Sequence, residues 1–165
     1  RLIYLICGED SEKTKELMEE LKTTGKYTIT PEMKEKLADF DAGYSTEEET
    51  AESIHDTYQK TGYVMDTHTA VAAHVCGQYR SKSGDQAKCV IASTASPYKF
   101  VKSVMSAIDA ENANADEFDL LPKLQEVSGV PMPQAIKDIL DAKVLHDLEC
   151  DADKMKDTVK GILGV

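Results

Sequence analysis

Three hydroxyl side chains crowd into the stretch ASTASPYKF, which covers residues 92–100. They are Ser93, Thr94 and Ser96, and they follow the short apolar run at residues 89–92. This run is rich in β-branched residues and predicts a buried strand. A proline then opens a segment whose apolar residues recur with helical spacing. The hydroxyls therefore lie at the edge of an open α/β sheet where ligands bind, because helix N-termini there present unpaired N–H groups.

A second polar junction, VMDTHTAVAAHV, covers residues 64–75. Asp66 or Thr67 is placed to cap a helix, and the small residues that follow allow another element to pack closely. His68 is unusual at the positive end of a helix dipole, so we expect its ring to be neutral if it is buried there. The sequence thus predicts two helix N-termini that carry polar side chains.

Each of these polar residues also has a purely structural interpretation. Ser93 and Thr94 are of the types that satisfy backbone groups in tight turns, and Ser96 is the expected cap of a helix that begins with proline. A lone histidine such as His68 is more often a satisfied polar residue than a catalyst. Lys99 lies against the helix dipole, where a nearby anion would stabilise it, but it is equally consistent with a solvated surface lysine. Local chemistry leaves these alternatives open.

The composition is that of one globular domain covering residues 1–165. Of its residues, 41% are hydrophobic and 30% are charged, which suits a core of ordinary size. The formal net charge is -11 at pH 7. Such acidity repels nucleic acid and anionic membranes, and no basic patch offsets it. We therefore expect neither nucleic acid nor a membrane as a partner.

The cysteines and the hydropathy favour a soluble, cytoplasmic protein. Four cysteines are widely scattered without a CxxC pair, which is typical of reduced thiols. No apolar stretch approaches the roughly 20 residues that a membrane helix needs. No spacing of His, Cys, Asp and Glu indicates a metal site. The chain opens at Arg1 directly in an apolar run, so we expect a piece of a longer chain.

Caps, glycine stops and apolar periodicity divide the chain into mostly helical segments. They predict helices over residues 11–24, 31–37 and 47–62, and further helices that start near 67 and near 97. Tail helices within 111–165 are predicted over 118–127, 133–140 and 152–163. Short strands are expected at 40–45 and 89–92. The predicted fold class is α/β, with few short strands covered by several helices.

Two motifs together resemble the C-terminal part of the threonine synthases. They are DTHTAV at residues 66–71 and STASPYKF at residues 93–100, in that order. The segments RLIY, CGED, MEELK and GKY within residues 1–27 are similar to the part of the family that follows its central ligand-binding strand. VLH and DKMK within residues 144–156 are similar to the family's tail. The resemblance thus spans nearly the whole chain.

The resemblance implies a C-terminal fragment of a pyridoxal-phosphate enzyme with the tryptophan-synthase-β-like fold, fold type II. Such enzymes convert O-phospho-L-homoserine and water to L-threonine and inorganic phosphate. The family places a hydroxyl that contacts the pyridine nitrogen at the STASP junction, where Thr94 is our first choice and Ser93 our second. By the same resemblance His68 and Thr69 would stand near the cofactor wall, and Lys99 would serve the helix or a substrate phosphate.

The sequence also departs from the family's pattern. The family often carries histidine where Ser96 stands, so we assign no chemical role to that position. The family's Schiff-base lysine and glycine-rich phosphate loop lie upstream of the matching residues, and neither is found in residues 1–165.

We therefore expect the C-terminal part of the large cofactor-binding domain, inactive alone and completed by the missing N-terminal part of the same enzyme. Unpaired strand edges would also permit self-association. The alternative is a self-standing, non-catalytic binding or interaction module on the same scaffold.

Overall fold

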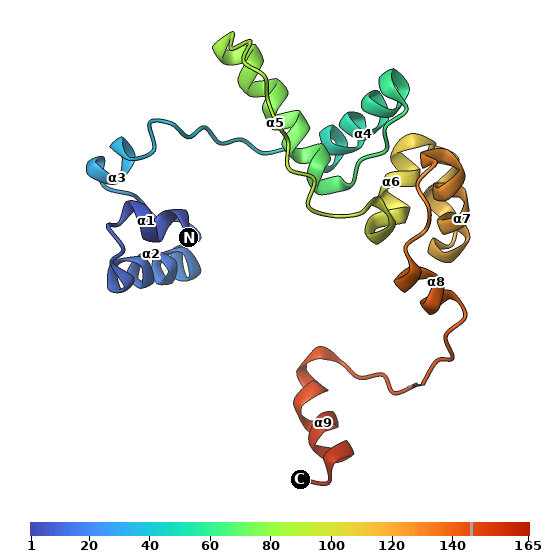
Figure 1. Ribbon diagram of the computed structural model, residues 1–165. Helices are drawn as coiled ribbons and strands as arrows, with labels where there is room; N and C mark the ends of the chain where they lie inside the picture. The colour runs from blue at the N-terminus through green and yellow to red at the C-terminus, as the bar shows by residue number, and fades with distance from the viewer. Residues whose placement is uncertain (146) are drawn as a thin grey trace.

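The computed structural model describes residues 1–145 and 147–165 as helices joined by irregular segments (Figure 1). The α-helices in these residues are α1 (Leu2–Ile6), α2 (Ser11–Thr24), α3 (Pro31–Glu35), α4 (Glu47–Thr61), α5 (Thr67–Ser83), α6 (Val101–Ile108), α7 (Glu117–Ser128), α8 (Gln134–Leu140) and α9 (Met155–Leu163). Short 3₁₀ segments are η1 (Pro97–Phe100), η2 (Ala110–Asn114) and η3 (Ala152–Lys154). None of the described helices combines the length and the apolar character needed to cross a bilayer. His146, the last residue of the motif VLH, lies outside the described residues.

Helices α2 and α4 begin and end where the capping residues predict, whereas α3 ends at Glu35, two residues before its predicted end. Asp10 starts α2 by accepting the N–H three residues further on at 2.9 Å. α4 begins at a capping box, in which the side chains of Thr46 and Glu49 each accept the other's backbone N–H. Gly25 and Gly62 end these two helices with φ of 77° and 72°, a left-handed backbone that glycine adopts without steric cost. The predicted bounds of both helices are confirmed.

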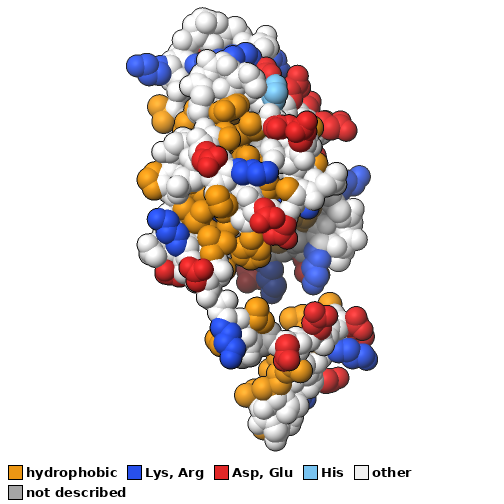
Figure 2. Space-filling model, turned by 90° about the vertical axis from the view of Figure 1, so that its right-hand side faces the viewer, with side chains coloured by type: hydrophobic (Ala, Val, Ile, Leu, Met, Phe, Trp, Pro, Cys, Tyr) orange, Lys and Arg blue, Asp and Glu red, His pale blue; other side chains and the backbone are white. Residues whose placement is uncertain are grey.

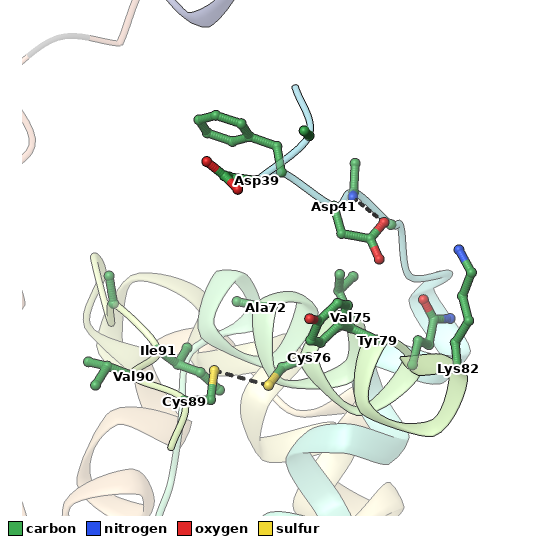
Figure 3. A pocket seen from close by; sticks show the side chains of 16 residues that line it. Asp39, Asp41, Ala72, Val75, Cys76, Tyr79, Lys82, Cys89, Val90 and Ile91 are labelled. Atoms are coloured by element: carbon green, nitrogen blue, oxygen red, sulfur yellow. Dashed lines mark hydrogen bonds between the residues drawn. The ribbon is translucent and has the colours of Figure 1, made fainter. Parts of the chain in front are cut away.

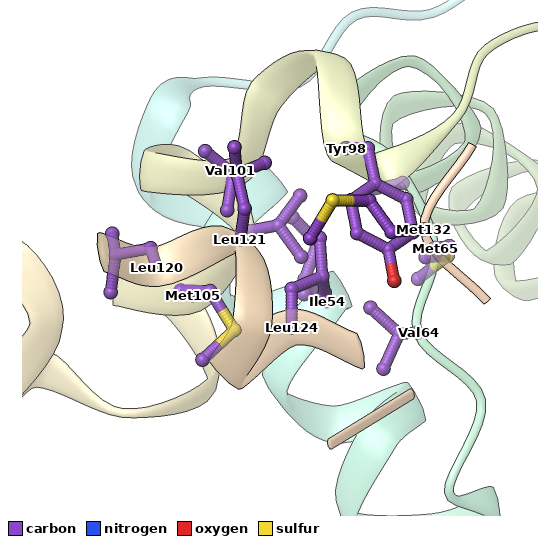
Figure 4. Close-up of a cluster of buried hydrophobic side chains, with 12 residues drawn as sticks. Ile54, Val64, Met65, Tyr98, Val101, Met105, Leu120, Leu121, Leu124 and Met132 are labelled. Carbon is purple, nitrogen blue, oxygen red and sulfur yellow. The ribbon is translucent and has the colours of Figure 1, made fainter. Parts of the chain in front are cut away.

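The main hydrophobic core lies between α4, α5, α6 and α7 (Figure 4). α4 packs against both α5 and α6, and α6 packs against α7. Ile54, Leu120 and Leu124 are among the most deeply buried of the described side chains. α6 adds Val104 and Met105, as the helical spacing of its apolar residues predicts. Each such side chain stabilises the fold by about 1.5–3 kcal/mol relative to leaving it in water.

Helices α1, α2 and α3 carry a smaller cluster of their own. Ile6, Leu17 and Met33 are buried together there. Figure 1 shows these helices away from the central ones and joined to them by an irregular segment, with α9 away from both. The described residues of α8 and α9 include no buried side chain. The expectation that residues 1–165 form one domain stays a prediction.

The predicted α/β class is not confirmed, because no strand forms in residues 1–145 and 147–165. Both segments predicted as strands, residues 40–45 and 89–92, are irregular, so those two predictions are wrong for this chain. A strand exists only where a neighbouring backbone supplies partners for its N–H and C=O groups. Residues 86–95 make no backbone–backbone hydrogen bond to any described residue. Val90 is 88% exposed, so the expected burial of this run is absent as well.

Apolar side chains remain at the surface of several elements. Figure 2 shows hydrophobic side chains gathered on one face, between scattered acidic and basic ones. Elsewhere the exposed apolar residues include Phe40 and Tyr44 in the segment before α4, and Met155 and Ile162 on α9. Gathered apolar surface typically marks contact with another protein or with another part of the same one.

Leu120→Ala should lower the free energy of unfolding by about 2–5 kcal/mol, because it leaves a cavity in the main core. Leu120 is fully buried, whereas Leu148 is 70% exposed. The matched control Leu148→Ala should therefore change the unfolding free energy by less than about 0.5 kcal/mol. Urea unfolding followed by circular dichroism measures both values, and equal losses would contradict this packing.

Candidate functional site

The N-terminus of α5 is built on a buried carboxylate. Asp66 directly precedes the helix, and its side chain is fully buried. Its Oδ1 accepts the N–H of His68 at 2.9 Å and the N–H of Thr69 at 3.3 Å. The Thr69 hydroxyl donates to Oδ2 of the same carboxylate. Of the two predicted caps for this helix, Asp66 is therefore the one that forms, and Thr67 becomes the first helical residue.

A hydrogen-bonded chain of hydroxyls joins this carboxylate to the second junction. Thr69 Oγ1 lies 3.0 Å from Ser93 Oγ. Because the single hydroxyl hydrogen of Thr69 goes to Asp66, Ser93 donates the second hydrogen bond. We call the series Ser93, Thr69 and Asp66 the hydroxyl chain. It brings together the two polar junctions that the sequence predicts. The hydrogen bond between Thr69 and Ser93, where the junctions meet, is partly buried.

The hydroxyl chain keeps Asp66 ionised. Burial by itself raises the pKa of this carboxyl, but hydrogen bonds from the Thr69 hydroxyl and from the N–H groups of His68 and Thr69 outweigh it. The pKa of Asp66 is therefore below its ordinary value. An ionised carboxylate only accepts hydrogen bonds, so it fixes the direction of each hydroxyl hydrogen in the chain.

Thr94 lies next to the hydroxyl chain and keeps its own hydroxyl free. Its side chain is exposed and takes part in no hydrogen bond with any residue that the structure describes. The hydroxyl hydrogen of Ser93, in contrast, is directed to Thr69. Of the two adjacent hydroxyls, Thr94 is thus the one that can donate to an acceptor outside the chain.

Ser96 and Tyr98 fix the segment on its C-terminal side. Ser96 Oγ accepts the Tyr98 N–H at 3.3 Å, which confirms the predicted cap at η1. The Tyr98 ring is buried in the main core, and its hydroxyl donates to the Val130 carbonyl at 2.6 Å. Tyr98 is not among the residues predicted to belong to the site. The available signal was an aromatic residue directly after a Ser-Pro cap.

His68 and Lys99 both face solvent. The His68 side chain is 61% exposed, with Nδ1 3.4 Å from Asp66 Oδ1 and its ring centroid 4.9 Å from that of Phe100. Burial, the condition under which we expected a neutral ring, is therefore not met. Lys99 is exposed on η1 and forms no ion pair with the described residues. Thr69 differs from both, because it is buried within the hydroxyl chain.

An open groove of about 970 Å³ lies between α5 and the irregular segments at residues 38–43 and 89–92 (Figure 3). On the α5 side the groove is lined by the apolar side chain of Val75 and by the phenol ring of Tyr79, among others. Ala92 also lines the groove and directly precedes Ser93. The groove therefore leads to the end of the hydroxyl chain.

The described residues fit only one end of pyridoxal phosphate. Thr94 offers a neutral donor for the ring nitrogen, but no glycine-rich turn offers N–H groups to the phosphate. Gly43 instead lies where the backbone passes close to α5, because an added Cβ would lie 2.9 Å from a Val75 methyl group. No group of three or more His, Cys, Asp or Glu side chains among the described residues could hold a metal ion.

The family described as "Threonine synthase, C-terminal" matches residues 69–159. This chain belongs to that family. The match begins at Thr69, within the hydroxyl chain, and includes Ser93 and Thr94. The resemblance carried by the two motifs is therefore confirmed for the threonine synthase family, and the alternative of a non-catalytic module is not favoured.

Threonine synthase relatives match most of this chain, but the chain spans only a part of each relative. It is 30% identical over 132 residues to Threonine synthase-like 1 of Homo sapiens, which is 79% of this chain and 17% of that protein. It is 32% identical over 152 residues to threonine synthase of Schizosaccharomyces pombe, 85% of this chain and 30% of that protein. Threonine synthase of Pseudomonas aeruginosa is 28% identical over 108 residues, 65% of this chain and 23% of that protein. The chain thus corresponds to less than a third of each.

Asp66→Ala should destabilise the chain more than the loss of an exposed cap does. It leaves the Thr69 hydroxyl and two N–H groups without an acceptor in a buried place, so the unfolding free energy should fall by about 2–4 kcal/mol. Asp116 is a matched control, because it caps α7 by accepting the Phe118 N–H at 2.8 Å but is exposed. Asp116→Ala should lower the same quantity by about 0.5–2 kcal/mol. Urea denaturation compares the two, and a larger loss for Asp116→Ala would refute the role given to the buried carboxylate.

The stabilising effect of Asp66 should depend on pH. Since the pKa of Asp66 is lowered in the folded chain, its contribution is complete above the unfolded pKa of about 3.9 and is lost as pH falls through the folded pKa. Asp66→Asn does not titrate. The difference in unfolding free energy between wild type and this variant should therefore shrink between about pH 6 and about pH 3. Denaturation series at constant ionic strength measure this difference, and a constant value over that range would show that the pKa is not lowered.

Proposed function

We propose that this chain is the C-terminal part of a threonine synthase that works with pyridoxal phosphate. The proposed reaction is a carbon–oxygen lyase reaction of cytoplasmic threonine biosynthesis, in which O-phospho-L-homoserine and water give L-threonine and inorganic phosphate. Membership of the threonine synthase C-terminal family supports this proposal. The observation that carries it is the hydroxyl chain, because it joins the two motifs of the family at one place beside a free hydroxyl.

In this proposal Thr94 donates a hydrogen bond to the pyridine nitrogen of the cofactor. A neutral hydroxyl leaves that nitrogen largely unprotonated, whereas a carboxylate partner favours its protonation. Ser93 is the second choice for this contact, because it must first give up its hydrogen bond to Thr69. When bound, pyridoxal phosphate supplies the electron sink of the reaction.

The other residues of the site position this donor. Ionised Asp66 orients Thr69, and Thr69 holds Ser93, the residue before Thr94. We place Lys99 and His68 on the substrate side, since both are exposed beside the junctions and an ammonium group attracts a phosphate. Thr69 would hold Ser93 in place and would not itself contact the cofactor.

The N-terminal part of the same enzyme completes the site in this proposal by supplying the Schiff-base lysine and the phosphate-binding loop. Residues 86–95 support such a partnership, because they make no backbone–backbone hydrogen bond to the described residues and Val90 is 88% exposed. A strand from the N-terminal part that pairs with this segment would satisfy its N–H and C=O groups and restore a parallel or mixed sheet.

Phosphate release from O-phospho-L-homoserine tests the proposal. The chain is mixed with a separately produced N-terminal part of a threonine synthase in the presence of pyridoxal phosphate. Activity should appear only in the mixture. Thr94→Ala should then lower the rate by about 5- to 100-fold, because one hydrogen bond to the cofactor is lost.

The matched control is Thr23→Ala, which removes an exposed hydroxyl on α2 that donates to two carbonyls of its own helix, those of Glu19 and Glu20. Its activity should equal that of wild type. If no mixture of folded parts releases phosphate, the assigned reaction is wrong. If the mixture is active but neither Thr94→Ala nor Ser93→Ala changes the rate, the reaction stands and the cofactor contact is wrong.

A further inference from the structure

Two cysteines face each other in the groove between α5 and the segment at residues 86–95. Cys76 lies on α5 and is partly buried, whereas Cys89 lies on the irregular segment and is exposed. The Cys76 thiol donates to Cys89 Sγ at 3.1 Å, as the dashed line in Figure 3 shows. The two residues are 13 positions apart without a CxxC motif, so their spacing does not predict the pair.

The chain reversal after α5 holds Cys89 against the helix. Gly84 ends α5 with φ of 71°, which turns the chain back. Arg80 Nη2 then donates to the Ala87 carbonyl at 2.7 Å. This bond ties the returning segment to the same helix that carries Cys76, so the meeting of the two thiols follows from the local fold.

The pair has room to form a covalent bond. Disulfide sulfur atoms lie about 2.05 Å apart, so the two thiols must approach by about 1 Å. Residues 86–95 can move by this amount, because no backbone–backbone hydrogen bond to the described residues restrains them. Neither of the other cysteines is paired in this way: Cys7 donates to Met33 Sδ at 3.9 Å, and Cys150 is an exposed free thiol.

We propose that Cys76 and Cys89 are a thiol-modification site that forms a reversible disulfide when the chain meets a low-molecular-weight disulfide such as oxidised glutathione. This inference concerns the chain itself and does not rest on the proposed synthase reaction.

The reaction has two exchange steps. First, the Cys89 thiolate attacks one sulfur of the small disulfide, whose S–S bond breaks, and the released small thiolate takes up the proton that Cys89 lost. Second, the Cys76 thiolate attacks Cys89 Sγ and displaces the other small thiolate, which takes up the Cys76 proton. Two protein thiols are oxidised and one small disulfide is reduced to two thiols, so atoms and electrons balance.

The order of the steps follows from the surroundings of each sulfur. Cys89 is exposed and accepts the hydrogen bond, so an oxidant can reach it first. The hydrogen bond to Cys89 raises the pKa of Cys76, and burial adds to this effect, whereas the Arg80 charge opposes it. Cys76 therefore stays protonated until Cys89 carries the small thiol, and it then acts as the resolving thiol.

The disulfide would restrain the hydroxyl-bearing segment on the side that lacks backbone hydrogen bonds. Ser93 follows Cys89 by four residues, and Tyr98 already anchors the other side in the main core. Oxidation would therefore hold both ends of this segment against the helices.

Peptide mapping of the whole chain after treatment with oxidised glutathione tests the proposal. Trypsin separates the two cysteines into peptides 61–80 and 89–99, because Arg80 and Lys88 lie between them. Without reduction, these peptides should appear as one linked species that is two hydrogen atoms lighter than their sum. The thiols of Cys76 and Cys89 should become unreactive toward an alkylating reagent together, and both should react again after treatment with dithiothreitol.

The control Cys150→Ser removes an exposed thiol outside the pair and should leave the linked species unchanged. Cys76→Ser should leave a glutathione adduct on Cys89. In urea, the wild-type chain should lose its preference for the Cys76–Cys89 disulfide over other pairings. The proposal is overturned if the folded wild-type chain keeps both thiols free, carries separate glutathione adducts on both, or links either residue mainly to Cys150. The wild-type measurement decides the question even if a variant does not fold.

Discussion

A buried negative charge organises the centre of this chain. Asp66 is shielded from water, and a carboxylate in such a place is stable only when donors occupy its oxygens. The first N–H groups of α5 supply donors at the positive end of the helix dipole, and the Thr69 hydroxyl supplies another. These bonds fix where α5 begins. They also fix the direction of the Thr69 hydroxyl hydrogen, so Ser93 must donate its own hydroxyl hydrogen to Thr69 Oγ1.

Buried residues of the apolar core hold the polar site in place. Asp66 directly follows Val64 and Met65, which are both buried, and the hydroxyl-bearing segment runs into Tyr98, which is buried as well. Asp66 therefore lies next to Met65, and Ser96 lies two residues before Tyr98, so both polar junctions adjoin the main core. Helices α4, α6 and α7 supply most of the buried side chains of that core.

The sequence allows good prediction of features that depend on neighbouring residues. The bounds of α2 and α4 follow from Asp10, Thr46 and the terminal glycines, because capping is a local interaction. The strand predicted at residues 89–92 is wrong for the opposite reason, since a strand needs a partner and none of the described segments supplies one. The cap at Asp66 could be foreseen, but its link to Ser93 could not. That link and the Cys76–Cys89 pair depend on how the chain returns along α5.

The lack of backbone–backbone hydrogen bonds between residues 86–95 and the rest of the described chain has a consequence for cooperativity. Because only side chains and the ends of the segment hold it, we expect its local opening to be separate from the unfolding of the main core. We expect a ligand that binds at Ser93 or Thr94 to bear the entropic cost of ordering this stretch, which lowers its apparent affinity. A strand that pairs with this segment would remove that cost in advance. Strand pairing and ligand binding would then strengthen each other without any rearrangement of the helices.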